Sequence, residues 1–98
     1  MLTRIVKMVF QPAETENFLA LFNRKKEHIR GFDGCEYLEL YRDQNDPTTF
    51  FTYSQWVDEN ALETYRHSGL FRETWKHTKP KFSERAQAWS VDKLVSLP

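Results

Sequence analysis

Residues 53–75 have the sequence YSQWVDENALETYRHSGLFRETW, which indicates the end of a strand followed by a helix in two parts. Asp58 stands where the N-cap of the first part is expected, and Ser68 can cap the second part. Aromatic and imidazole side chains are concentrated here: Tyr53, Trp56, Tyr65, His67 and Trp75, followed by His77. Because such groups can bind or modify a flat, partly polar small molecule, we expect this stretch to line any active pocket.

Before this stretch, the pattern predicts a strand, a helix and a hairpin. Residues 2–10 are apolar and β-branched with alternating sides, which is typical of a strand. Residues 13–29 carry apolar side chains at helical spacing and are followed by Gly31 at the expected C-cap. Residues 36–42 and 48–56 then predict two strands joined by a polar turn.

A fourth strand around residues 86–91 completes the order β-α-β-β-α-β. This order predicts an α+β, ferredoxin-like sandwich, in which helices cover one face of a four-stranded antiparallel sheet. The strands nevertheless carry large apolar groups on both sides, as with Phe50 and Phe51, or Leu40 and Tyr41. Because the bare face of such a sheet is ordinarily polar, we expect a homodimer formed through the sheet face.

Length and composition limit the possible functions. At 98 residues, with 14 basic and 14 acidic side chains, the chain is expected to be one domain, residues 1–98, without the positive footprint of nucleic-acid binding. Arg4 and Lys7 interrupt the apolar N-terminus, so neither a signal peptide nor a membrane span is expected. The single cysteine, Cys35, fits a reducing compartment, and we expect a cytoplasmic protein.

Three segments together resemble the antibiotic biosynthesis monooxygenase superfamily: residues 31–35 (GFDGC), 54–62 (SQWVDENAL) and 68–73 (SGLFRE). They match a Gly-rich turn before the second strand, a Trp that ends the third, an acidic helix start and a Ser-x-x-Phe segment. The resemblance covers nearly the whole chain and implies a dimeric α+β barrel with one pocket per subunit between helices and sheet. Members include cofactor-free monooxygenases acting on quinol-like polyketides, haem-degrading monooxygenases and relatives without known activity.

The haem-degrading branch uses an Asn on the first strand and a Trp and a His in the second helical region. Alignment of this chain with that branch places Tyr65 at the Trp position and Trp75 at the His position, and residues 2–10 contain no Asn. An indole cannot ligate iron, so we expect no haem and no other cofactor, although His67 or His77 leaves a shifted ligand open. The histidines also lack the spacing of a metal site.

The cofactor-free branch implies a substrate that reduces dioxygen itself once it is deprotonated. Imidazole is the side-chain type suited to proton transfer near neutral pH, so His67 is the candidate catalytic base. Tyr53, Trp56, Tyr65 and Trp75 are the candidate pocket for a small aromatic substrate. Each has a structural alternative: His67 can simply end a helix, and the aromatic residues can pack in the core.

The sequence therefore predicts a cofactor-independent monooxygenase that oxidises an aromatic or quinol-like molecule. The alternative is a non-catalytic small-molecule-binding or stress-response module that uses the same pocket. A titratable group facing an open cavity would favour the enzyme, whereas a cavity filled by Trp56, Tyr65 and Trp75 would favour a binding or structural role.

Overall fold

The sheet and its strand order follow the predicted topology. The computed structural model describes residues 1–98, and its four antiparallel strands lie in the order β2-β3-β1-β4. The strands are β1 (Leu2–Val9), β2 (Cys35–Arg42), β3 (Thr49–Trp56) and β4 (Gln87–Val91). The α+β, ferredoxin-like prediction is thus confirmed.

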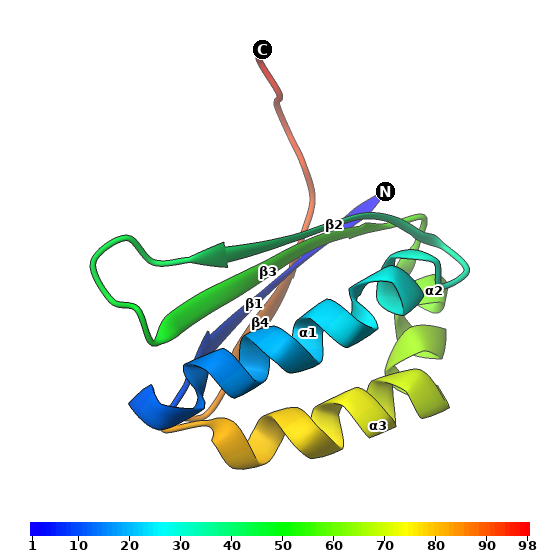
Figure 1. Ribbon diagram of the computed structural model, residues 1–98. Coiled ribbons are helices and arrows are strands. Elements are labelled where there is room, and N and C mark those ends of the chain that lie inside the picture. The colour runs from blue at the N-terminus through cyan, green and yellow to red at the C-terminus, as the bar shows by residue number, and fades with distance from the viewer.

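The helices form a second layer on one face of the sheet (Figure 1). They are α1 (Thr15–Arg30), α2 (Glu59–Arg66) and α3 (Gly69–Thr78), with short 3-10 turns η1 (Pro12–Glu14) and η2 (Lys79–Lys81). The second helical region is in two parts, as predicted, and α2 turns into α3 at one end of the sheet. None of these helices has the length and apolar character needed to cross a membrane.

Two predicted side-chain caps set the start of α2 and α3. The Asp58 carboxylate accepts a hydrogen bond from the Ala61 amide at 2.8 Å, and the Ser68 hydroxyl accepts one from the Phe71 amide at 3.1 Å. Each cap satisfies an amide at a helix start that has no partner within the helix, which stabilises the helix by about 1 kcal/mol. The caps therefore determine where the aromatic residues of α2 and α3 fall.

Gly34 lets the turn before β2 approach α2 closely. Its φ is +90°, in the region that favours glycine, and a Cβ at this position would lie 2.4 Å from the Cβ of Ala61. The Gly34 carbonyl also accepts a hydrogen bond from the Val57 amide at 2.9 Å. The glycine-rich turn thus packs the start of β2 against the segment that leads into α2.

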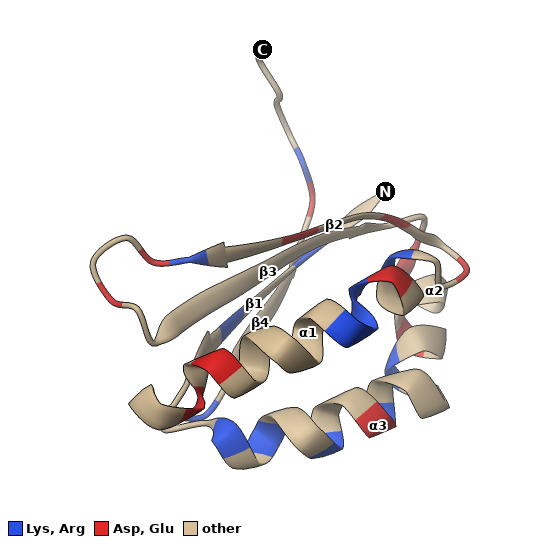
Figure 2. Ribbon diagram, viewed as in Figure 1, with Lys and Arg blue, Asp and Glu red and all other residues tan.

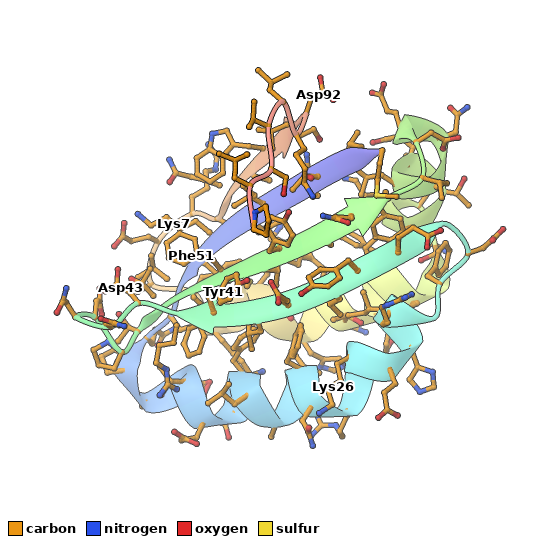
Figure 3. All side chains as sticks on the ribbon, turned by 90° about the horizontal axis from the view of Figure 1, so that it is seen from above. Lys7, Lys26, Tyr41, Asp43, Phe51 and Asp92 are labelled. Carbon is orange, nitrogen blue, oxygen red and sulfur yellow. The ribbon has the colours of Figure 1, made fainter.

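The strand register separates two faces of the sheet. Ile5 pairs with Tyr53, while Met8 pairs with Phe50, and these pairs lie on opposite faces because side chains alternate along a strand. The covered face carries Met8, Phe50 and Trp56 against the helices. The open face carries Tyr41 and Phe51, which Figure 3 shows from above over β2 and β3.

The buried core consists of two clusters rather than one. Met8, Phe10, Phe18 and Phe50 form the first, and Cys35, Trp56 and Leu62 form the second. Charged side chains lie mainly on the helices, the turns, β1 and β2, and β3 and β4 carry none (Figure 2). The space between the two clusters is the feature from which the functional site is built.

Candidate active site

A cavity of about 300 Å³ lies between the helices and the covered face of the sheet. Nineteen residues line it, and thirteen of them are hydrophobic. This volume is at the lower end of the range for small-molecule sites, which are mostly apolar with a few polar groups. The cavity is therefore suited to a small, flat, largely apolar ligand.

Short side chains leave this space open. On the sheet the lining includes Thr52 and Ser54 of β3 and Ala86 and Ala88 at the start of β4, and on the helix side it includes Thr74 of α3. Larger members of both core clusters line the same cavity, which places it between the clusters. The interior is thus packed at both ends and hollow in the middle.

A continuous aromatic wall borders the cavity, and we define it as Trp56, Tyr65, Phe71 and Trp75. Successive ring centroids lie 4.9 Å, 5.2 Å and 5.7 Å apart, with stacked, edge-on and stacked geometry respectively. The Trp56 indole is buried and donates its N–H to the Ser54 hydroxyl at 3.0 Å. The wall is therefore held by ring packing and offers its faces and edges to a flat molecule.

Tyr65 adds one polar group to the aromatic wall. Burial, the main cause, and the nearby Cys35 raise the pKa of its phenol above the ordinary value. The phenol therefore stays protonated at neutral pH and can donate a hydrogen bond. Its chemistry is that of a donor rather than a base.

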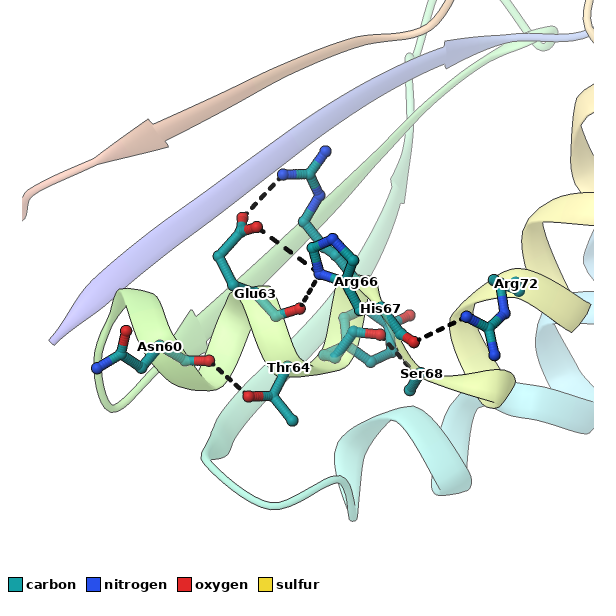
Figure 4. Close-up of polar contacts among 8 residues, drawn as sticks. Asn60, Glu63, Thr64, Arg66, His67, Ser68 and Arg72 are labelled. Atoms are coloured by element: carbon teal, nitrogen blue, oxygen red, sulfur yellow. Dashed lines mark hydrogen bonds and ion pairs between the residues drawn. The ribbon is translucent and has the colours of Figure 1, made fainter.

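Two arginines bring positive charge to the cavity. Arg4 of β1 lines it from the sheet and donates to the Ser90 hydroxyl at 2.9 Å. Arg66 of α2 lines it from the helix side and pairs with the Glu63 carboxylate at 2.9 Å (Figure 4). Guanidinium groups remain charged throughout the physiological pH range, so the cavity is cationic.

His67 does not line this cavity. Its side chain is 78% exposed, and Nδ1 lies 2.8 Å from the Glu63 carbonyl oxygen and 3.9 Å from the Glu63 carboxylate (Figure 4). The ring therefore lies at the C-terminal end of α2, where the helix leaves carbonyl groups free. A catalytic role for His67 stays a prediction, and its position outside the cavity does not favour it.

Tyr53 is separated from the other three predicted pocket residues. Trp56, Tyr65 and Trp75 line the cavity together, whereas Tyr53 lies on the open face. There its ring meets that of Tyr37 edge-on at 6.0 Å, and its hydroxyl accepts a hydrogen bond from the Gln55 amide at 3.1 Å. Tyr53 thus does not share this cavity with the other three, because positions 53 and 56 have opposite parity on one strand.

The cavity residues do not fit haem ligation. The cavity lining contains no histidine and no cysteine, and its one methionine is Met8. Trp75, at the position aligned with the haem ligand, offers only an indole N–H. His77 points elsewhere, with Nε2 3.3 Å from the Glu73 carboxylate and half of its side chain exposed. The prediction that the chain works without a cofactor is untested, and these residues supply no axial imidazole.

Sequence reasoning missed both arginines, although each had a signal. Arg4 shares the alternating side of β1 with Val6 and Met8, and a lone charge on an apolar strand face is unusual. Arg66 follows Leu62 by four positions and thus lies on the same face of α2. Arg66 lines the cavity, whereas the adjacent His67 does not.

Solved structures of similar shape confirm the fold class. An antibiotic biosynthesis monooxygenase superposes with a TM-score of 0.91 at 22% identity, over 97% of this chain and 100% of that one. A conserved protein from Methanosarcina mazei Go1 gives 0.88 at 20% identity, over 95% and 93%. Rv0793 from Mycobacterium tuberculosis gives 0.89 at 15% identity, over 99% and 98%. A search of curated protein sequences found no significant match.

The family follows from the sequence itself. The sequence model of the family described as "Antibiotic biosynthesis monooxygenase" matches residues 1–77, which hold β1 to α2, all of α3 except its last residue, and the whole aromatic wall. The chain belongs to the antibiotic biosynthesis monooxygenase family, as its sequence motifs indicated. This membership supports a monooxygenase-type function in general terms.

Proposed function

We propose that this protein is a cofactor-independent monooxygenase that oxidises a flat aromatic or quinol-like molecule with dioxygen. The aromatic-walled cavity of about 300 Å³ is the observation that carries the proposal. A largely apolar cavity holds a flat substrate in place and keeps water from reactive intermediates. Family membership supports the general class of reaction.

In the proposed reaction the substrate supplies all the electrons. A phenol or its keto tautomer loses a proton, and the resulting anion reduces dioxygen at an activated carbon. For a ring CH₂ group the balanced change is to a carbonyl: one oxygen atom stays in the product, and the other leaves as water with the two hydrogens of the CH₂. The protein then needs to position the substrate and favour its anion.

Oxygen uptake with anthrone, a flat ketone that enolises to a phenol, tests this proposal. We expect uptake without added cofactor and one atom of labelled dioxygen in the isolated quinone. Trp75→Ala should lower the rate at least about tenfold because it opens the aromatic wall. Val57→Ala is the control, since Val57 is 45% exposed and lies outside both the cavity and the strands.

The same assay separates the enzyme from the non-catalytic module. Quenching of tryptophan fluorescence by anthrone without enhanced oxygen uptake would contradict catalysis and support a binding module. An equal effect of Trp75→Ala and Val57→Ala on uptake would contradict the cavity as the site.

We also propose that the protein is a homodimer paired through the open face. Large exposed side chains of the strands gather there: Tyr37, Tyr41, Trp89 and Val91. The solvent-accessible area of 6592 Å² exceeds the roughly 5,900 Å² expected for a compact monomer of this mass. A light-scattering mass of two chains at micromolar concentration is expected, and a mass of one chain would contradict the dimer.

A reducing compartment, the cytoplasm, is the proposed location. Cys35 is buried, and burial is the main cause that raises the pKa of its thiol. A buried thiol with a raised pKa is poorly nucleophilic and resists oxidation. This supports a structural role for Cys35, with no part in the proposed oxidation.

A further inference from the structure

The ionisable side chains that line the cavity include no acid and no imidazole. They are Arg4, Tyr65 and Arg66. Both guanidinium groups stay charged, and the Tyr65 phenol stays protonated because burial raises its pKa. A ligand in the cavity therefore meets two cations and a hydrogen-bond donor, and no side-chain carboxylate.

Arg4 has no carboxylate partner of its own. It is half-buried, its Nη1 donates to the Ser90 hydroxyl at 2.9 Å, and none of the ion pairs of the chain includes it. The nearby Glu63 pairs instead with Arg66 at 2.9 Å, with His67 3.9 Å away. A guanidinium has five N–H donors, so most donors of Arg4 remain free for a ligand.

The electrostatics around Arg4 agree with this geometry. Burial, as the main cause, and the positive charge of Arg66 lower the pKa of Arg4, while Glu63 opposes them. A cation whose charged form is disfavoured by its surroundings gains from an incoming anion. The arginine is thus placed in an apolar cavity with its charge incompletely balanced by the protein.

We infer that Arg4 recognises the anionic oxygen of a flat, largely apolar acid whose ring lies against the aromatic wall. This inference rests on the proposed function and names the substrate class. Arg66 adds positive potential from α2 while it remains paired with Glu63. For a phenol, the guanidinium favours the phenolate and the proton passes to solvent, so no carboxylate or imidazole base is needed in the cavity.

Two probes of the same shape test the inference in the wild-type protein. Binding of 2-naphthoate and of neutral 2-naphthamide is followed by quenching of tryptophan fluorescence. We expect 2-naphthoate to bind about tenfold more tightly, as a charge-assisted hydrogen bond predicts. Equal affinities would overturn the inference without recourse to any variant.

Three arginine variants then locate the preference. Arg4→Met should abolish the preference for 2-naphthoate and leave the affinity for 2-naphthamide unchanged. Arg66→Met should reduce the preference by a smaller factor, about threefold, because its charge is shared with Glu63. Arg24→Met is the control, since Arg24 is exposed on α1 outside the cavity. A preference that survives in Arg4→Met would overturn the assignment to Arg4.

A third probe distinguishes a phenol from a carboxylic acid as the natural ligand. The absorbance of bound 2-naphthol reports its ionisation, and we expect the wild-type protein, but not Arg4→Met, to lower its pKa by about one unit. A lowered pKa supports anion recognition of a phenol, and a preference for 2-naphthoate alone supports recognition of a carboxylate. Binding of all three probes without charge preference overturns this inference but leaves the proposed function standing, whereas no binding of any probe overturns both.

Discussion

The covered and open faces of the sheet are both aromatic, yet they differ in what lies against them. Phe50 and Phe51 are neighbours on β3, but Phe50 is 1% exposed beneath the helices and Phe51 faces away from them. On the open face Tyr41 and Trp89 remain 49% and 45% exposed. Hydrophobicity alone therefore does not separate core from surface in this chain.

The two faces also differ in how a charged group on each is paired. On the covered face, the guanidinium of Arg4 lines the cavity without a carboxylate partner. On the open face the Glu39 carboxylate accepts hydrogen bonds from the hydroxyls of Tyr37 and Tyr41, so its charge is satisfied within one strand. These arrangements agree with the proposed binding of a small anion at the covered face and with the proposed dimer at the open face.

The largest difference between the faces should appear in stability. Phe50→Ala is expected to lower the free energy of unfolding by about 3–5 kcal/mol, because it leaves a cavity in the first core cluster. Phe51→Ala should lower it by about 1 kcal/mol in the monomer. Urea denaturation at low protein concentration measures both values, and equal losses would show that the open face is also covered in the monomer.

The second difference should appear in association. Trp89→Ser is expected to weaken the proposed dimer at least about tenfold, because an exposed aromatic residue at an interface often contributes much of the binding energy. Sedimentation equilibrium measures the dissociation constant. Val57→Ser is the control, since Val57 is 45% exposed but precedes α2 outside the strands. Equal weakening by both substitutions would contradict pairing through the open face.

A third difference concerns titration of the open face. The hydrogen bond to Glu39 raises the pKa of Tyr41 from 10.0 to about 12, and the hydrogen bonds from Tyr37, the larger cause, and from Tyr41 lower the pKa of Glu39. The Tyr41 contribution to stability is thus complete below about pH 10 and lost as the pH rises to about 12. The Glu39 contribution is lost as the pH falls through its lowered pKa.

Tyrosinate absorbance measures this titration. Glu39→Gln should bring the ionisation of Tyr41 and Tyr37 back toward the ordinary range, because an amide does not oppose the tyrosinate charge. Tyr65 is the internal reference, since its raised pKa arises from burial on the covered face. An unchanged absorbance curve in Glu39→Gln would contradict the Tyr41–Glu39 interaction.

The smallest expected effect is that of His67. His67→Ala should leave anthrone turnover and 2-naphthoate affinity unchanged, because the ring lies outside the cavity and is mostly exposed. Steady-state oxygen uptake across neutral pH measures this. A large loss of turnover would restore His67 as the catalytic base and assign part of the chemistry to the outer surface of α2.

The fold was predictable because its signals are local. Alternation along β1 and β3, the Asp58 and Ser68 caps and the glycine turn each act within a few residues. Trp56, Tyr65 and Trp75, three of the four predicted pocket residues, line one cavity because they follow one another along this locally determined stretch. Tyr53 lies outside that cavity, and the alternation of side chains along β3 is enough to separate it from Trp56.

The local sequence pattern was sufficient to predict the helices and strands, their order and the aromatic stretch beside the cavity. The hollow between the core clusters was not predictable, because it depends on how short side chains such as Thr52, Ala88 and Thr74 face one another across two layers. Packing also placed Arg4 and Arg66 beside one cavity and left His67 outside it. Sixty-two positions separate those arginines in the chain (66 − 4), and local periodicity carries no information over that distance.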